Sequence, residues 1–256
     1  MQKTKFISFI LLCFATLFLS SCVNYERSET VKYSENITNE SRHFDEEFDK
    51  INASSGIEVI IEQSNETEVT IITNEDFHDK IKTRVEDGTL YISSRSTKSS
   101  FSIFGYKSNR IQDSSIKKVI VKMPIISAIE ANSASKIENK GILRGNAITL
   151  NASSASEIKL HLEFDRIEAE SNSASKIELE GMALDLNANA SSASKIEADD
   201  LLVNTIIAES SSASEIKVHP IVNLKANASS AGEIKYNNNP KQIEKESNSG
   251  GNIFLE

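Results

Sequence analysis

The sequence predicts an all-β protein, a right-handed parallel β-helix (β-solenoid) with about 19–20 residues per repeat. A short serine-rich motif recurs at intervals of about twenty residues, and apolar residues alternate with polar ones on both sides of each copy. The third observation is a leader-like segment at the N-terminus. With 256 residues, the chain is long enough for one elongated domain.

The recurring motif is Ser-Ala-Ser followed by a charged residue, an isoleucine and a second charged residue, and its last copy has Gly in place of the second serine. Each copy contains one alanine that serves as a reference position, which we call the repeat alanine. The repeat alanines are Ala134, Ala155, Ala174, Ala193, Ala213 and Ala231. Similarity at a fixed period is typical of solenoids, in which each repeat completes the core of its neighbours.

Alternation on both sides of the motif predicts two strands per repeat. The residue three positions after the repeat alanine is always isoleucine, and its two neighbours are always charged. Positions seven and five before the alanine are mostly apolar, and the position three before it is Ala or Ser in every copy. A period of two indicates a strand with one buried face. Each repeat is therefore expected to form a strand, a corner of small residues and a second strand, and to stack in parallel on the next repeat.

The outward position four residues before the repeat alanine alternates between two residue types. Reading along the chain, it is Glu130, Asn151, Glu170, Asn189, Glu209, Asn227 and Glu246. If the repeats stack in register, these side chains form one exposed column with neighbours about 4.8 Å apart. Asparagines between the glutamates then double the separation of like charges, although the alternation also fits duplication of a two-repeat unit.

The domain organisation follows from where the repeat is regular. We expect a single solenoid domain over residues 43–256, with an irregular N-terminal part (43–125) and regular repeats (126–256). Residues 51–59 resemble an early repeat, and residues 247–253 a seventh, glycine-modified copy. Strands are expected at 59–61, 69–72, 90–93 and 117–123, and a helical turn at 77–81. Residues 95–115 read as an insertion whose Phe101, Phe104 and Tyr106 form either a binding tip or a flap folded onto the body.

The first residues resemble a lipoprotein signal peptide. Lys3 and Lys5 precede an apolar stretch, residues 6–19, which is short for a membrane-spanning helix. Leu19-Ser20-Ser21-Cys22 then resembles a lipobox, in which the cysteine is lipidated and becomes the new N-terminus. We therefore expect a signal peptide (1–21), a lipidated Cys22 with a flexible tether (22–42), and attachment in the cell envelope, at the outer membrane. An uncleaved anchor with an incidental cysteine is the alternative.

The sequence offers no recognisable catalytic chemistry. The net charge is −9 and no basic patch stands out, which argues against nucleic acid as a partner. Metalloprotease, phosphate-loop and nucleophile-elbow motifs do not occur. We expect the serine runs to be corner residues whose hydroxyls satisfy turn backbone. The expectation is a protein that is not an enzyme, with no catalytic residues, no metal site and no cofactor.

The corner sequence, Asn-Ala-Ser-Ser-Ala-Ser before a charged-Ile-charged triplet, resembles a known family. It is similar to the "putative auto-transporter adhesin, head GIN domain" family, which is common in lipoproteins of Bacteroidota. The resemblance covers about residues 44–255 and includes Phe44, Phe48 and Ile51 near its start. Family members usually have Ser-Gly-Ala/Ser-Gly at the corner, where this chain has Ser-Ser-Ala-Ser. The resemblance implies a β-helical fold and an envelope location, and it supplies no catalytic residues.

Three hypotheses for function follow. The leading one is a lipid-anchored binding or adhesion module of the cell envelope, whose partners are the membrane, through its lipid, and a glycan or an envelope protein. The second is a polysaccharide-acting enzyme on a β-helix, which a cluster of carboxylates on one face would favour. The third is a passive structural spacer.

Overall fold

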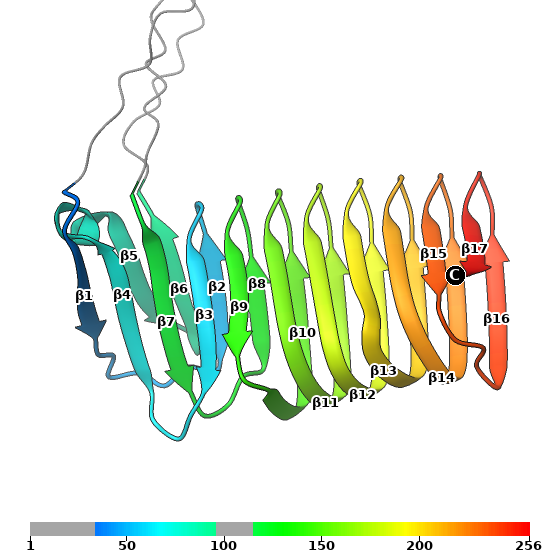
Figure 1. Ribbon diagram of the computed structural model, residues 1–256, viewed down its shortest axis with the longest axis horizontal. Coiled ribbons are helices and arrows are strands. Elements are labelled where there is room, and N and C mark those ends of the chain that lie inside the picture. Colours follow the sequence, from blue (N-terminus) through cyan, green and yellow to red (C-terminus); the bar gives the residue numbers. More distant parts are fainter. Residues whose placement is uncertain (1–33, 96–114) are drawn as a thin grey trace, which may run out of the picture. The chain divides into compact units, whose positions relative to one another are not determined.

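The regular repeats form a stack of flattened coils, each built from two strands and a sharp corner (Figure 1). The computed structural model describes residues 34–95 and 115–256. Neighbouring coils pair in parallel. The strands of this part are β8 (Ala128–Ala131), β9 (Lys136–Lys140), β10 (Leu143–Ala152), β11 (Glu157–Ser171), β12 (Lys176–Ala190), β13 (Lys195–Ser210), β14 (Glu215–Ala228), β15 (Glu233–Tyr236), β16 (Gln242–Ser247) and β17 (Asn252–Leu255). The predicted parallel β-solenoid is confirmed.

The chain reverses direction abruptly at one end of each coil and gradually at the other. At one end the chain reverses through the Ser-Ala corner; at the other, strands such as β11, β12 and β13 bend gradually without a break in strand structure. In Figure 1 the chain passes over the corners, descends on the near side and ascends on the far side as it advances toward the C-terminus. This path is a right-handed coil, as the sequence predicted.

The corners have an unusual backbone conformation. At all six motifs the serine and the repeat alanine both have positive φ, for example 54° at Ser173 and 60° at Ala174. The N–H of Ser175 donates to the carbonyl of Asn172 at 3.3 Å, which closes a two-residue turn of type I′ geometry. The N–H of Ala174 donates to the carbonyl of Ser192 in the next coil at 3.0 Å. The tips of the corners are thus joined in their own hydrogen-bonded ladder.

A buried serine anchors five of these six corners to the preceding coil, and the sixth has Gly232 at this position. Ser175 is 2% exposed; its Oγ accepts from the N–H of Asn172 at 3.1 Å and donates to the carbonyl of Ala152 at 2.8 Å. The same two bonds recur at Ser135, Ser156, Ser194 and Ser214. These serines satisfy turn backbone that is buried between coils, as expected from the sequence.

The core consists of columns of like residues. The isoleucines three positions after the repeat alanine are all fully buried, and Ile158, Ile177 and Ile196 are direct partners in the ladder. On the other strand, Ala169, Ala188 and Ala208 align in the same way. Each column therefore continues through several coils, which explains why the sequence alternation was so regular.

The N-terminal part stacks in an order that differs from the chain order. Its elements are β1 (Ile37–Arg42), β2 (Lys50–Ser54), β3 (Glu58–Gln63), β4 (Glu68–Asn74), the 3₁₀ helix η1 (Glu75–Lys80), β5 (Ile81–Glu86), β6 (Thr89–Ser94) and β7 (Lys117–Met123). Strand β2 lies between β6 and β8, and β3 lies between β7 and β9. The early repeat predicted at residues 51–59 is thus the direct neighbour of the first regular coil, and the β6–β7 pair, although later in sequence, lies on its far side.

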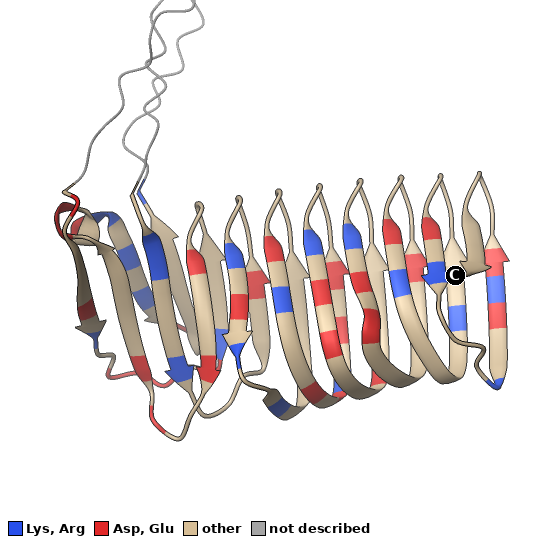
Figure 2. Ribbon diagram, viewed as in Figure 1, with Lys and Arg blue, Asp and Glu red and all other residues tan. Residues whose placement is uncertain are grey.

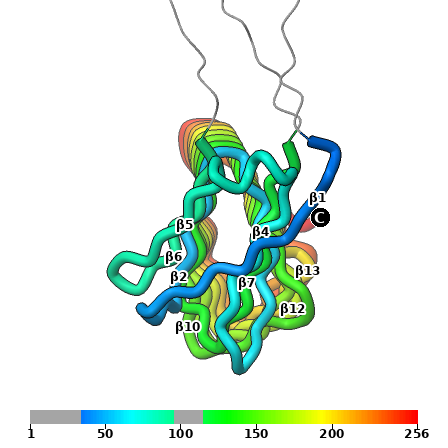
Figure 3. The backbone as a smooth tube through the Cα atoms, turned by 90° about the vertical axis from the view of Figure 1, so that its left-hand side faces the viewer, coloured from blue at the N-terminus to red at the C-terminus, as the bar shows by residue number. Residues whose placement is uncertain are grey.

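Strand β1 corrects one prediction. Residues 22–42 were expected to be a flexible tether, but residues 37–42 pair antiparallel with β4. In Figure 3 this strand crosses in front of the N-terminal opening of the stack. Hydrophobic alternation could not reveal β1, because neither of its faces is buried.

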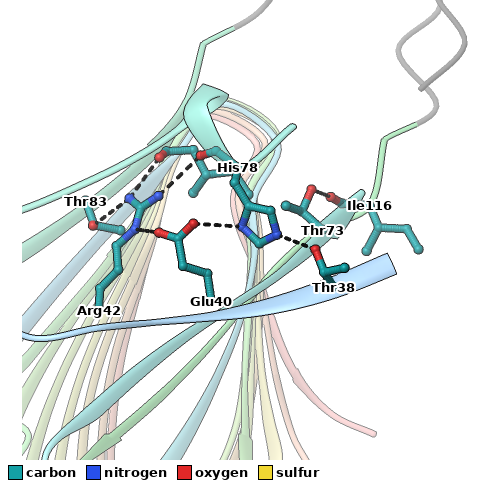
Figure 4. A network of polar contacts seen from close by, with 8 residues as sticks. Thr38, Glu40, Arg42, Thr73, His78, Thr83 and Ile116 are labelled. Carbon is teal, nitrogen blue, oxygen red and sulfur yellow. Dashed lines mark hydrogen bonds and ion pairs between the residues drawn. The ribbon is translucent and has the colours of Figure 1, made fainter. Parts of the chain in front are cut away.

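Polar contacts hold β1 in place (Figure 4). The Arg42 guanidinium donates to the carbonyls of Ile81 and His78, at 3.0 and 3.2 Å, and to the Glu40 carboxylate at 2.7 Å. The His78 ring lies 2.8 Å from Thr38 Oγ1 and 3.3 Å from Glu40 Oε2. These contacts tie the first strand to η1 and to the start of β5.

The strands that follow the corners carry a ladder of opposite charges (Figure 2). Glu215, on β14, accepts from Lys195 at 2.7 Å and from Lys235 at 2.9 Å, so that one carboxylate joins three coils. Its side chain is 18% exposed. Hydrogen bonds from Lys195 and Lys235 lower the pKa of Glu215 to about 2.

A depressed carboxyl pKa predicts acid-sensitive stability. Because the pKa of Glu215 is lower in the folded chain than in the unfolded chain, its contribution is complete above about pH 4.5 and is lost as the pH falls toward 2. We expect Glu215→Gln to lower the free energy of unfolding by about 1–2 kcal/mol at pH 7, allowing for solvent screening. The free energies of unfolding of the two proteins, measured by urea titration, should become equal near pH 2. A difference that does not depend on pH would contradict this role for Glu215.

A polar groove as the candidate functional site

A groove of about 580 Å³ runs along the strands that precede the corners, across the C-terminal coils. Three columns of residues line it: the Glu/Asn column four before the repeat alanine, the small residues three before, and the Asn/Ser column two before. Its lining is Glu170, Asn189, Glu209, Asn227 and Glu246; Ala190, Ser210 and Ala228; and Asn172, Ser191, Ser211, Ser229 and Asn248. The groove thus spans five coils, or about 19 Å at the strand spacing.

The Glu/Asn column predicted from the sequence is confirmed. Asn189 is the ladder partner of both Glu170 and Glu209, and Asn227 is the partner of both Glu209 and Glu246. The column also extends further than predicted, because Asn52 of β2 pairs with Glu130 and donates to its carboxylate at 2.7 Å. Acid and amide therefore alternate on one face from the N-terminal part to the last coil.

Differences in side-chain length create the hollow. At its N-terminal end, Asn172 donates to Glu170 at 2.8 Å, so two long polar side chains are bonded to each other there. In the next three coils the position two before the repeat alanine is serine rather than asparagine, so the wall is lower there. Asn248 restores the longer side chain in the last coil. The groove is thus a low stretch between two asparagine-bearing coils.

Much of the polar lining makes no hydrogen bond to the protein. In the N-terminal part of the column, Glu130 is bonded by Asn52 and by Asn132, at 2.7 and 2.9 Å. In the groove, by contrast, the side chains of Glu209, Asn227 and Glu246 have no hydrogen-bond partner among the residues that the structure describes. The C-terminal half of the column therefore presents carboxylates, amides and hydroxyls that are free to bond a ligand.

The chemistry of the groove favours some ligands and disfavours others. Its lining contains acceptors, amide donors and hydroxyls, but no Lys, Arg, His or aromatic residue. Three carboxylates without a balancing cation repel phosphate, sulfate and uronate groups. The surface suits an extended, uncharged ligand with many hydroxyl groups, or one that carries amines. Within residues 34–95 and 115–256 no group of three His, Cys, Asp or Glu side chains is placed to hold a metal ion.

The structure does not describe the candidate residues from the N-terminal leader and from the insertion. Cys22, Phe101, Phe104 and Tyr106 are all outside the described residues. The described part contains no helix that is both long and apolar enough to cross a bilayer. Sequence reasoning identified the Glu/Asn column but missed the groove, whose signal was the run of serines at 191, 211 and 229 between Asn172 and Asn248.

Comparison with models of known protein families shows which family the chain belongs to. The model of the family described as "Putative auto-transporter adhesin, head GIN domain" matches residues 47–240, which is most of the chain. The chain belongs to this family. A search of curated proteins finds no match. The head GIN resemblance inferred from the corner motif is therefore confirmed.

Solved structures share the fold of this head GIN protein. A "putative adhesin" from Bacteroides fragilis has a TM-score of 0.75 at 19% identity, over 88% of this chain and all of the other. A "putative adhesin" from Parabacteroides distasonis has a TM-score of 0.68 at 20% identity, over 89% of this chain and all of the other. A "putative lipid binding protein" from the same species has a TM-score of 0.66 at 19% identity, with 89% and all of the chains covered. At these identities the likeness concerns the fold.

The alternation in the Glu/Asn column predicts that an added carboxylate in this column destabilises the protein. Asn189→Glu would place three carboxylates in successive coils, each about 4.8 Å from the next. Two new repulsions of about 0.8 kcal/mol each should lower the free energy of unfolding by about 1–2 kcal/mol at low salt. Most of the loss should disappear near 1 M salt, where screening acts within about 3 Å. Asn189→Gln should be nearly neutral. Urea titrations at two salt concentrations test this, and a salt-independent loss would contradict the repulsion.

Proposed function

We propose that this protein is a lipid-anchored binding module of the outer membrane, with no catalytic activity, and that its polar groove binds a glycan. The observation that supports this ligand is the groove itself, in which carboxylates, amides and hydroxyls recur at the coil spacing over about 19 Å. In its C-terminal part the side chains of Glu209, Asn227 and Glu246 make no hydrogen bond to the described residues. A polymer with a regular series of hydroxyl groups can bond several coils at once, and each coil adds a weak contact. Membership of an adhesin family supports a binding role in the envelope.

The electrostatics of the groove restrict the glycan class. The ligand is expected to be neutral or amine-bearing, because Glu170, Glu209 and Glu246 line the groove without any cation. The same argument excludes nucleic acid from this surface, since the phosphate backbone dominates its binding. An envelope protein could use the same hydrogen bonds, but only through an extended polar segment, since the groove has no apolar pocket for an anchor side chain.

A binding screen with matched variants tests the groove. The protein without its leader and without Cys22, residues 23–256, is screened against neutral, amine-bearing and acidic glycans. Asn227→Ala, inside the groove, should weaken binding of the best ligand at least about tenfold, the effect of losing one or two hydrogen bonds. Asn151→Ala removes the same residue type from the same column outside the groove, and should leave binding unchanged. Equal effects, or preference for acidic glycans, would contradict the proposal.

The screen also separates the alternatives. The proposal predicts that bound glycan is recovered intact. Turnover that disappears in Glu209→Gln would instead identify a polysaccharide-acting enzyme. Absence of any glycan ligand, combined with capture of a defined envelope protein that Asn227→Ala abolishes, would assign the groove to a protein partner. No ligand of either kind would favour the passive spacer.

The lipid anchor has its own test. Cys22 follows Leu19-Ser20-Ser21 and is the residue expected to carry the lipid. We expect Cys22→Ala to abolish incorporation of labelled fatty acid and to release the protein from the membrane fraction. Cys13→Ala, within the apolar leader segment, should change neither property and serves as the control. Retention of lipid label in the Cys22→Ala protein would contradict the lipobox interpretation.

A further inference from the structure

The gradual bends of the coils carry an exposed apolar patch. In Figure 1 these bends form the lower edge of the stack, opposite the corners. Four large apolar side chains gather there, each 38–53% exposed: Met182, Leu184, Leu202 and Ile221. They belong to three successive strands, β12, β13 and β14, and together they line a hollow of about 410 Å³. We call these four residues the bend patch.

The fold does not require apolar residues at this place. Met182 and Leu202 are ladder partners, and their outward position can be followed through five coils: Arg144, Glu163, Met182, Leu202 and His219. Polar residues therefore occupy the same position in the coils before and after the pair. A group of exposed apolar side chains that the core does not need is typical of a surface that contacts another molecule.

Acidic side chains surround the bend patch. Glu180 and Asp200, which are ladder partners, precede the patch in their coils. Asp185 directly follows Leu184, and Asp165 lines the edge of the hollow. The carboxylates of Asp165, Asp185 and Asp200 form no hydrogen bond or ion pair with other residues that the structure describes. They are therefore free to pair with a cationic partner.

The cations beside the patch do not balance these charges. Arg144 pairs with a fifth carboxylate, that of Glu163, at 2.8 Å. Arg166 is the ladder partner of Asp185. Five carboxylates thus surround the apolar side chains against two guanidinium groups, so the bend patch attracts positive charge and repels negative charge.

Charge and shape select the kind of partner. The five carboxylates would repel an anionic lipid surface. A single acyl chain would stay largely in water, because the side chains that would hold it are themselves partly exposed. A sugar ring would find no open aromatic face, since Phe164, the aromatic residue of the lining, is 5% exposed. A protein segment, in contrast, can cover the patch with its own apolar side chains and place cations beside them.

We propose that the bend patch is a docking surface for an amphipathic helix of a partner protein, with leucine-like side chains on one face and Lys or Arg beside them. A helix lying along the stack presents its apolar face once per turn, about every 5.4 Å, which is close to the coil spacing of about 4.8 Å. Successive turns then contact Met182, Leu202 and Ile221, and the basic side chains lie over Asp185 and Asp200. This surface is separate from the polar groove.

Binding of designed peptides to residues 23–256 tests the proposal. The probe is a labelled helical peptide of about four turns, with leucines on one face and lysines on both flanks. Fluorescence anisotropy should show saturable binding that weakens as the salt concentration rises, because the charged contacts are exposed. Exchanging the lysines of the peptide for glutamate should weaken binding at least about tenfold, and exchanging its leucines for serine should abolish binding.

Matched variants of the protein locate the contact. Met182→Ser and Leu202→Ser should each weaken binding of the lysine peptide at least about fivefold, through loss of one apolar contact. Asp185→Asn should weaken it at low salt and have less effect at high salt. Ile207→Ser is the control, because Ile207 is similarly exposed (42%) and lies on the same strand as Leu202 but outside the patch. Asn227→Ala, in the polar groove, should also leave peptide binding unchanged. Urea titration establishes that each variant is folded.

The same measurements distinguish other occupants of the patch. The proposal is overturned if no peptide binds, if the lysine and glutamate peptides bind equally, or if Ile207→Ser weakens binding as much as Leu202→Ser. Binding to vesicles of phosphatidylcholine and phosphatidylglycerol that Leu202→Ser abolishes would assign the patch to a lipid surface instead. A dimer in sedimentation velocity that Leu202→Ser dissociates would assign it to a second copy of the chain.

Discussion

Replacing four neighbouring repeat alanines by glycine, Ala155, Ala174, Ala193 and Ala213 together, is expected to raise the free energy of unfolding by about 2–4 kcal/mol. Each of these alanines has a φ of 60°, in the left-handed region. An L-residue with a Cβ pays about 1–2 kcal/mol there, whereas glycine pays no such cost. Glycine also makes the unfolded chain more flexible, which removes about 0.4–1 kcal/mol of the gain. A net gain of about 0.5–1 kcal/mol remains at each corner.

The corners are well suited to this change because the alanine methyl groups contribute little packing. All four repeat alanines are exposed at the tips of the turns. The chain already uses glycine at the equivalent position in its first and last corners, at Gly56 and Gly250, where φ is 70° and 80°. The same conformation is therefore compatible with glycine at this position in the stack.

Urea titration of the fourfold variant against the unmodified chain measures the gain. Ala188→Gly is the matched control, because Ala188 is fully buried within β12 and does not have positive φ. That change should destabilise the protein by about 0.5–1 kcal/mol or more, through strand flexibility and lost burial. If the fourfold variant is less stable than the unmodified chain, the alanines hold the corners through something other than backbone conformation.

The regular coils were predictable from the sequence because each column repeats one physical requirement. Ile177 needs the same environment as Ile158 and Ile196, so the same residue recurs at the same offset. The tight corner was visible as small residues, and its outward Glu/Asn column was visible as an alternation. Period-two patterning and a repeat near twenty residues were sufficient to define the architecture.

The N-terminal part was less predictable because its partners are not determined by local pattern. Strand β2 carries a recognisable early repeat, but nothing in its sequence shows that β6 and β8 flank it. Strand β1 has no buried face and is held by backbone pairing and by Arg42, so it resembled a polar tether. The groove was missed for a related reason: its depth depends on differences in side-chain length between coils rather than on any one motif.

The isoleucine column gives the second large prediction. Ile177→Ala is expected to lower the free energy of unfolding by about 2–5 kcal/mol, the usual cost of truncating a buried aliphatic side chain. Ile177 is fully buried and lies between Ile158 and Ile196 in the ladder. Both neighbours are held by their own coils, so the coils cannot close around the cavity without disturbing the backbone pairing on either side.

The adjacent residue provides the control. Lys176 points outward, where its side chain is 35% exposed and pairs with Glu178 and Glu197 at 3.0 and 2.6 Å. Loss of these partly exposed ion pairs in Lys176→Ala should cost at most about 1 kcal/mol. The comparison uses urea unfolding followed by circular dichroism, and equal losses at the two positions would contradict the alternation of buried and exposed residues on which the assignment of the core depends.

Position along the stack adds a further test of how the solenoid is stabilised. In a linear array, stability is close to a sum of coil energies and of interfaces between neighbouring coils. Ile177 contributes to two such interfaces. Among the described residues Ile253 has one ladder partner, Ile234, and it is partly exposed. Ile253→Ala should therefore lower the free energy of unfolding by less than half as much as Ile177→Ala.

The cavity left by Ile177→Ala should also weaken the link between the two halves of the stack and broaden the urea transition. Ile253→Ala, at the end of the stack, should leave that transition sharp. If both substitutions cost the same and leave equally sharp transitions, the coils unfold as one cooperative unit and position along the stack does not determine stability.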